Sequence, residues 1–339
     1  MSSKVTLTEY FQAVDRHLIK SKKEPKEGFR VRICGKLIDL RFLTVEMAQA
    51  GRCSLEGFLT EEAGAPDATL LYWYDRCDAY LPAGESAYSS IWQSRDATGS
   101  LQIGTDNHRL VGSDFVRRRF YYARPKPDEI DYSVYGHTLA GLFSRWASES
   151  DCMLLHAAAV GWRGKGVLVV GRSGSGKSTF SVSCLTAGLD FVSDDYTLIS
   201  ASGPLLAMPL YTSVAVNPDM YAKMPWLGDP SVEPSAAWCN GKYQFRLERQ
   251  HLCPALEIHG IIMPRISGED APSIRSVPAG SAMTQMLHSS LKQLDRNRDT
   301  ELMRTFAARM GGLPVYEMSM STDLTKNPAF LRSFIEKEF

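Results

Sequence analysis

The sequence predicts an α/β fold preceded by a separate α+β domain, and three observations lead to this prediction. A glycine-rich segment at residues 171–178 lies between a short apolar run and a helical run. From Met153 onward, short β-prone runs are punctuated by glycines. A proline-rich segment, ARPKPDE at 123–129, separates this part from what precedes it. Because 339 residues favour two domains, we expect an N-terminal α+β domain at 1–128 and an α/β domain at 129–339.

The N-terminal part shows helical spacing first and β-prone runs afterwards. Leu7, Phe11, Val14 and Leu18 recur at helical spacing and predict one buried face. We expect a helix over 6–20, a hairpin over 29–42 turning near Gly35, a strand over 68–74, and short strands over 101–122 broken at 104–107 and 112–114.

The second part alternates strands and helices around the glycine-rich segment. We expect a helix over 132–149, strands over 154–160 and 167–170, a helix over 179–187 ended by Gly188, a strand over 189–193, helical structure over 277–311, a strand over 314–318 and a last helix over 328–338.

Composition and charge exclude several classes of protein. Lys and Arg together number 38, as do Asp and Glu, so the net charge is zero and general nucleic-acid binding is not expected. No run of 18 apolar residues is present, so no membrane span is expected. The N-terminus lacks the apolar stretch of a signal peptide, and the seven cysteines form no CxxC pair. We therefore expect a cytoplasmic protein with free thiols.

The segment from Gly171 to Ser178 fits the phosphate-binding pattern GxxxxGK[ST] in full, between a strand and a helix. Glycines allow backbone N–H groups to surround phosphate oxygens, and the helix N-terminus favours negative charge. We expect Lys177 to reach the β- and γ-phosphates of a nucleotide and the Ser178 hydroxyl to bind Mg²⁺. The nucleotide contacts expected in this segment come from Gly171, Ser173, Gly174, Ser175, Gly176, Lys177, Ser178 and Thr179.

Two carboxylates follow the next expected strand. Asp194 and Asp195 come directly after 189–193, and a βαβ crossover would make that strand parallel to 167–170. Their side chains would then lie at the same edge of the sheet as the glycine-rich loop. One carboxylate can bind the metal, and the other can accept a proton from an attacking hydroxyl.

His156 lies on the strand before the loop, and a hairpin through residues 161–166 would bring it to the same end of the sheet. Together, His156, the loop, Gly188 and the Asp194–Asp195 pair resemble the catalytic core of the HPr kinase/phosphorylase family. The fold of that family is related to ATP-dependent phosphoenolpyruvate carboxykinase. The resemblance is strong over about 40 residues and implies a P-loop kinase domain of this type.

The resemblance also implies roles for individual residues. Asp194 would accept the proton of the substrate hydroxyl, and His156 would assist that transfer or orient Asp194. Asp195 would support the metal together with Ser178. Lys242, in a Gly-Lys pair, would reach the nucleotide or the substrate phosphate.

The sequence thus predicts an Mg²⁺- and ATP-dependent phosphotransferase that modifies a hydroxyl, expected to be a serine of a protein or peptide. Residues 1–128 would then serve recognition of this partner. A small-molecule kinase and a nucleotide-dependent switch or assembly ATPase stay open as alternatives, as do the preference between ATP and GTP and the formation of a homo-oligomer.

Overall fold

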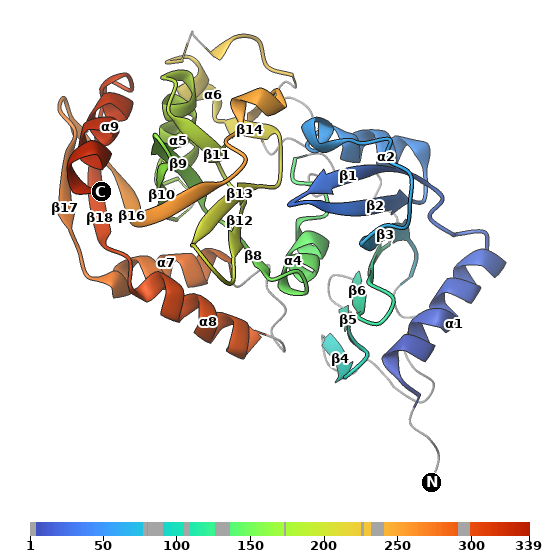
Figure 1. Cartoon of the computed structure of the whole chain (residues 1–339). Coiled ribbons are helices and arrows are strands. Elements are labelled where there is room, and N and C mark those ends of the chain that lie inside the picture. The colour runs from blue at the N-terminus through green and yellow to red at the C-terminus, as the bar shows by residue number, and fades with distance from the viewer. Residues whose placement is uncertain are drawn as a thin grey trace. The chain divides into compact units, whose positions relative to one another are not determined.

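The computed structural model of the chain describes residues 5–76, 80, 91–104, 109–125, 136–172, 174–224, 227–231, 241–290 and 299–339. The chain divides into two compact units, Met1–Glu149 and Ser150–Phe339. Both units combine helices and sheets, so the expectation of a mixed α/β protein is confirmed at this level (Figure 1). Within the described residues, no helix has the length and apolar character needed to cross a membrane.

The first unit is built on a seven-stranded sheet in the order β1-β2-β3-β7-β6-β5-β4. Its elements are α1 (Leu7–Lys20), β1 (Glu27–Ile33), β2 (Lys36–Phe42), α2 (Val45–Arg52), η1 (Glu56–Phe58), β3 (Ala68–Tyr74), β4 (Ile91–Asp96), β5 (Gly99–Gly104), β6 (Arg109–Asp114), β7 (Arg119–Arg124) and α4 (Ala140–Ser148). The pairs β2–β3 and β3–β7 are parallel, and the other neighbours are antiparallel.

Helix α1 covers one face of this sheet through the four apolar residues that its sequence predicts. Leu7, Phe11, Val14 and Leu18 are buried in a core that includes Trp73. Thr6 and Glu9 form a reciprocal capping box that satisfies the first free N–H groups of the helix. The helix therefore combines a well-defined start with a buried apolar stripe, which explains why its sequence pattern is clear.

The expected strand break at residues 112–114 is wrong. Strand β6 runs through Gly112. This residue is a glycine because the Phe11 ring of α1 occupies the space where a side chain would stand. The turn follows at residues 115–118, where the Asp114 carboxylate accepts hydrogen bonds from the backbone N–H and Nε of Arg117. A glycine inside a strand here marks close packing, not a turn.

The second unit is built on a nine-stranded sheet whose main order is β11-β9-β10-β16-β13-β12-β8, with β18 beside β16 and β17 beside β18. Its elements are β8 (Cys152–Leu155), β9 (Ala158–Trp162), β10 (Lys165–Val169), α5 (Lys177–Thr186), β11 (Asp190–Ser193), β12 (Thr197–Ser200), β13 (Leu206–Pro209), β14 (Ser213–Val216), α6 (Pro218–Tyr221), β15 (Tyr243–Arg246), η4 (Arg249–His251), β16 (Leu256–Glu269), β17 (Ser273–Ser276), α7 (Ala279–Ser290), α8 (Asp299–Gly311), β18 (Val315–Ser321) and α9 (Lys326–Glu338).

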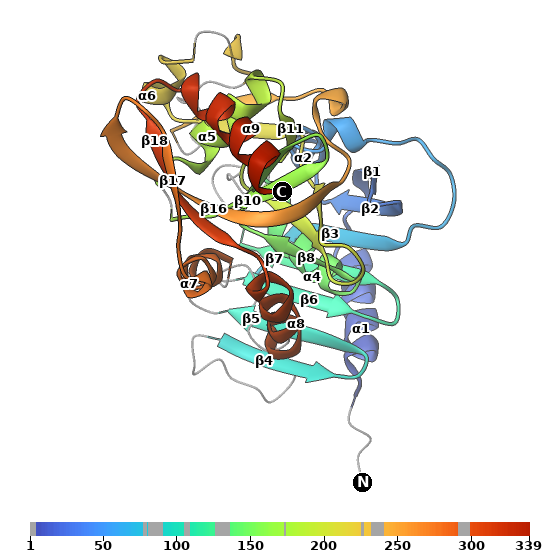
Figure 2. The same cartoon turned by 60° about the vertical axis from the view of Figure 1, so that its left-hand side comes forward.

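Helices cover both faces of this second sheet. Helices α5 and α9 lie on one face, and α7 and α8 lie on the other (Figures 1 and 2). Met286 of α7 and Phe306 of α8 share a core with Leu168 of β10 and Ile261 of β16. The central strands are therefore buried on both sides, which accounts for their continuous apolar runs.

The arrangement has one feature that the sequence did not predict and one that differs from the prediction. Strand β11 is parallel to β10 as expected, but β9 lies between them and is antiparallel to both. The expected helix at 132–149 begins only at Ala140 and ends at Ser148: residues 136–139 form a turn in which Leu139 is left-handed (φ 55°), and residues 126–135 lie outside the described part. This helix belongs to the first unit, where Arg145 donates hydrogen bonds to Ser100 and Ser113, so the division of the chain lies at 149/150 instead of 128/129.

Candidate active site

The glycine-rich loop connects β10 to α5, as its sequence context predicts. Gly174 and Gly176 both have left-handed φ angles, of 80° and 94°, and Gly176 is the N-cap of α5. The side chain of Met320 packs where a Cβ on Gly176 would stand, so this position needs glycine on both grounds. The Ser175 hydroxyl is buried and has no hydrogen-bond partner among the described residues. A loop of this form has polar groups that can donate hydrogen bonds to the oxygens of an anion.

Lys177 is the first residue of α5 and is almost entirely buried, with 6% of its surface exposed. Its Nζ donates to the backbone oxygens of Gly171 at 2.8 Å and Arg172 at 3.3 Å. Burial lowers the pKa of Lys177, while the negative charge of Asp195 opposes that shift. The ammonium group therefore lies under the loop, within electrostatic reach of the carboxylate pair.

Asp194 follows β11 directly and is 2% exposed. Its Oδ2 accepts a hydrogen bond from the backbone N–H of Ala215 in β14 at 3.2 Å. Burial, followed by the neighbouring charge of Asp195, raises the pKa of Asp194 to about 7. A carboxyl group with this pKa can take up or release a proton near neutral pH.

His156 forms a hydrogen bond with Asp195, whereas the resemblance implies a role beside Asp194. Its Nε2 lies 2.5 Å from Asp195 Oδ1, and both side chains are about one-fifth exposed, at 22% and 23%. The histidine occupies the bend between β8 and β9, and its ring stacks on Tyr196 with centroids 5.3 Å apart. Tyr196 in turn meets the edge of the Tyr211 ring. These contacts fix the orientation of the imidazole.

Lys242 immediately precedes β15, after Gly241 in a left-handed conformation. Its positive charge lowers the pKa of both Lys177 and Asp194. Lys242 is therefore close enough to act electrostatically on both groups. The strand pair β14–β15 brings this lysine and the N–H group bound by Asp194 from two distant parts of the sequence.

The remaining predicted residues fall into three groups. Gly171, Gly174, Ser175 and Gly176 lie in the loop, and Ser178 and Thr179 lie in the first turn of α5. Ser173 lies outside the described residues.

The predicted protein ligands for a metal ion are Ser178 and Asp195. The described part of the chain has no cluster of three or more His, Cys, Asp or Glu side chains suited to a metal ion. Mg²⁺ commonly uses only one or two protein carboxylates together with phosphate oxygens, so a hydroxyl and a carboxylate suit it.

Sequence reasoning missed three side chains that surround the loop. Gln285 of α7 approaches Gly171, and Met320 of β18 and Ile266 of β16 approach Gly176. Ile266 is 67% exposed, which is unusual for an isoleucine. These residues lie about 90 or more positions after the loop, so only the pairing of β10, β16 and β18 reveals their proximity.

Comparisons with known proteins do not show which family the chain belongs to. No family model matches the chain, and no curated protein matches it. Among solved structures, the chain is similar to the HPr(Ser) kinase/phosphatase from Coxiella burnetii, with 14% sequence identity over 55% of this chain and 95% of that chain. The TM-score of this match is 0.29, a value that does not establish a shared fold.

Proposed function

We propose that the second unit is a kinase that uses Mg²⁺ and ATP to phosphorylate a hydroxyl group, with a serine of a protein or peptide as the acceptor. The observation that supports this proposal is that Lys177 donates to the glycine-rich loop, while burial lowers its pKa and the charges of Asp195 and Asp194 raise it. A site that only binds phosphate needs no carboxylates beside the loop, whereas phosphoryl transfer needs a metal ligand and a proton acceptor.

The nucleotide would bind with its phosphates in the loop. The unpartnered Ser175 hydroxyl and the backbone N–H groups at the start of α5 would donate to phosphate oxygens. Lys177 would exchange its backbone partners, Gly171 and Arg172, for the β- and γ-phosphates. This exchange needs only rotation of the lysine side chain, because its two present acceptors belong to the loop itself.

Ser178 and Asp195 would hold Mg²⁺, which supplies positive charge against the phosphate oxygens. The hydrogen bond from His156 would keep Asp195 in a fixed orientation toward this ion, so we assign His156 a positioning role. Lys242 would add a second positive charge for the phosphates, because its charge acts on both Lys177 and Asp194.

In the transfer step, the acceptor oxygen forms a bond to the γ-phosphorus while the bond from that phosphorus to the β,γ-bridging oxygen breaks. The acceptor proton passes to the Asp194 carboxylate, and ADP leaves with the electron pair of the broken bond. The raised pKa of Asp194 suits this role, because a carboxylate of ordinary pKa is a weak proton acceptor at neutral pH.

The test combines binding and transfer with the full chain. Calorimetry should show binding of Mg²⁺-ATP, and Lys177→Ala should weaken this binding and reduce transfer about 30- to 1000-fold. Incubation with γ-labelled ATP, cell extract and candidate peptides, followed by mass spectrometry, should reveal a labelled hydroxyl.

Three results would contradict the proposal in different ways. A wild-type chain that binds neither Mg²⁺-ATP nor Mg²⁺-GTP would exclude a nucleotide site altogether. Slow hydrolysis without any labelled acceptor would favour the switch or assembly ATPase, and label on a metabolite would favour a small-molecule kinase.

A further inference from the structure

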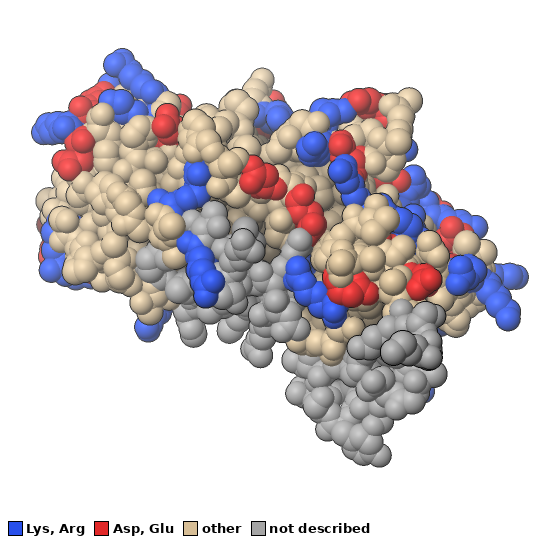
Figure 3. Space-filling view, turned by 60° about the horizontal axis from the view of Figure 1, so that its bottom comes forward, with Lys and Arg blue, Asp and Glu red and all other residues tan. Residues whose placement is uncertain are grey.

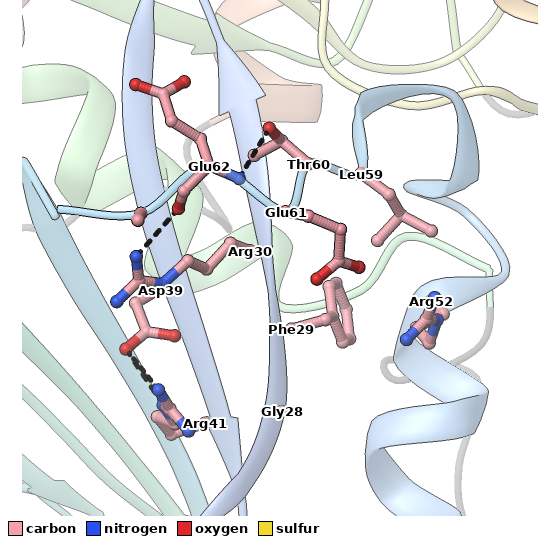
Figure 4. A pocket seen from close by; sticks show the side chains of 11 residues that line it. Gly28, Phe29, Arg30, Asp39, Arg41, Arg52, Leu59, Thr60, Glu61 and Glu62 are labelled. Atoms are coloured by element: carbon pink, nitrogen blue, oxygen red, sulfur yellow. Dashed lines mark hydrogen bonds and ion pairs between the residues drawn. The ribbon is translucent and has the colours of Figure 1, made fainter.

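The first unit contains a hollow of about 400 Å³ at the outer edge of its sheet. It is lined by residues of β1, β2, α2 and the segment after η1, which are Gly28, Phe29, Arg30, Asp39, Arg41, Arg52, Leu59, Thr60, Glu61, Glu62 and Ala63 (Figure 4). Successive residues of a strand point to opposite faces of a sheet, and three successive residues of β1 line this hollow. The hollow therefore follows the edge of β1 and is not confined to one face.

Strand β1 is the first strand of the sheet, so only one of its edges is paired with a neighbour, β2. The chain itself covers part of the other edge: Val31 forms an antiparallel bridge with Leu59, and the Thr60 N–H donates to the Arg30 oxygen at 3.0 Å. The backbone groups of Arg30 thus point away from β2, and by the two-residue period those of Gly28 point the same way. Gly28 is exposed, and no described residue bonds to its outward N–H and C=O groups.

A buried acceptor lies one strand behind this open edge, on β2. Asp39 is 7% exposed, and its Oδ2 accepts from Arg41 at 2.9 Å. Its Oδ1 is buried and has no hydrogen-bond partner among the described residues. Figure 4 shows this second oxygen on the side of β1. An unsatisfied buried carboxylate oxygen is costly, so it points to a donor that is supplied by a bound molecule.

The charges of the hollow argue against a phosphate or nucleic-acid ligand. Arg30 donates to the backbone oxygens of Glu62 and Gly64, and Arg41 is held by Asp39. Arg52 lies over the Phe29 ring. With two of the three guanidinium groups engaged and three carboxylates in the lining, the hollow offers no net positive charge.

We propose that this hollow binds an extended peptide, which adds as a further strand to β1 at Gly28. The peptide would exchange two backbone hydrogen bonds with Gly28 and continue the antiparallel pairing that Leu59 and Thr60 begin. One side chain with a hydroxyl, amide or ammonium donor would reach Asp39 Oδ1. The residue next to it would lie on the opposite face, between Arg52 and Glu61.

The test uses a phage-displayed random peptide library, selected on the immobilised full chain without nucleotide, and synthetic copies of the selected peptides. N-methylation removes a backbone donor, so methylation at alternate peptide residues should weaken binding about tenfold or more, while methylation at the residues between them should be tolerated. Asp39→Asn should weaken binding about tenfold, and Arg16→Glu, an exposed charge reversal on α1, should leave it unchanged.

Failure to select any peptide, an N-methyl scan without alternation, or equal binding by wild-type and Asp39→Asn chains would each overturn the proposal. The N-methyl scan uses only the wild-type chain, so the test holds even if Asp39→Asn disturbs the fold through Arg41. The site lies in the first unit and the assay contains no nucleotide, so its outcome is separate from that of the proposed kinase activity.

Discussion

Asp194 is a carboxyl group with almost no access to water, beside a second carboxylate, Asp195, that is about one-fifth exposed and pairs with His156. The same doublet of aspartates therefore contains two chemically different groups. Burial makes Asp194 a better proton acceptor, and the histidine holds Asp195 in place. Identical residues thus acquire different roles from their surroundings, and predictions for the two can be separated.

Asp194→Asn should leave Mg²⁺-ATP affinity nearly unchanged and lower transfer about 10²- to 10⁴-fold, because it removes the proton acceptor. Asp195→Asn should instead weaken Mg²⁺-nucleotide binding, and added Mg²⁺ should partly restore its activity. Titrating Mg²⁺ in both variants separates these roles. Wild-type transfer rates in both would show that the pair is only a strand-end turn.

The wild-type transfer rate should rise with pH through about 7, because only the ionised form of Asp194 accepts a proton. His156→Ala should reduce the rate less than Asp194→Asn and keep this rise, because the histidine contacts Asp195. Transfer rates measured at saturating nucleotide from pH 5.5 to 9 test this expectation. A rise that disappears in His156→Ala would assign the titration to the His156–Asp195 pair.

The free energy of unfolding should be lowered by the burial of the Asp194 charge. Folding raises the pKa of Asp194 from 3.8 to about 7, so ionisation of Asp194 opposes folding. The resulting loss of stability is absent below about pH 4, grows up to pH 7 and stays constant above it. Asp194→Asn should therefore stabilise the chain by about 2–4 kcal/mol at pH 8 and much less at pH 4.5. Urea unfolding at both pH values, with the exposed Asp219→Asn as control, measures the difference. An equal gain at both would contradict the assignment.

At the scale of elements, local patterns predicted those parts whose structure depends on local interactions. The stripe of α1, strand β3 and helix α5 ending before Gly188 all appear as expected. The predictions that failed depend on partners distant in sequence. Gly112 stays inside a strand, where its lack of a side chain leaves room for the Phe11 ring. The position of β9 between β10 and β11 and the hydrogen bond between His156 and Asp195 could not be foreseen for the same reason. Neither spacing nor composition contains these pairings.

The loop glycines provide a matched pair for a test at this scale. Both have left-handed φ angles, but a Cβ on Gly174 meets open space and a Cβ on Gly176 meets the Met320 side chain. Gly174→Ala should cost about 1 kcal/mol from backbone strain, and Gly176→Ala slightly more, about 1–2 kcal/mol, because the flexible end of Met320 must also move. Met320→Ala in the same chain should recover part of the second loss. Thermal unfolding measures these three variants together with Met320→Ala alone, and equal costs for the two glycines would rule out the Met320 contact.

At the scale of the whole molecule, the two units have separate cores and carry separate proposed sites. On the described part of the face in Figure 3, acidic and basic side chains are interspersed, in keeping with the zero net charge. A protein of this kind would select a partner by shape and local chemistry, and not by a field of one sign.

Residues 150–339 alone should bind Mg²⁺-ATP within about threefold of the full chain, because the loop, the carboxylates and Lys242 all belong to this unit. The same fragment should lose modification of a peptide acceptor, if the hollow beside β1 recognises that peptide. Calorimetry and the labelling assay measure the two properties. A fragment that binds no nucleotide, or that labels the acceptor at the full rate, would contradict this division of labour.

Strand β9 lies between β10 and β11 and thereby sets the distance between the glycine-rich loop and the Asp194–Asp195 pair in the proposed active site. Neighbouring strands lie about 4.8 Å apart, so the ends of β10 and β11 are separated by about two such steps, roughly 10 Å. If β11 were adjacent to β10, the two strand ends would be separated by only one such step, roughly 5 Å. The extra strand acts as a spacer, and the bend at its beginning places His156 beside that gap.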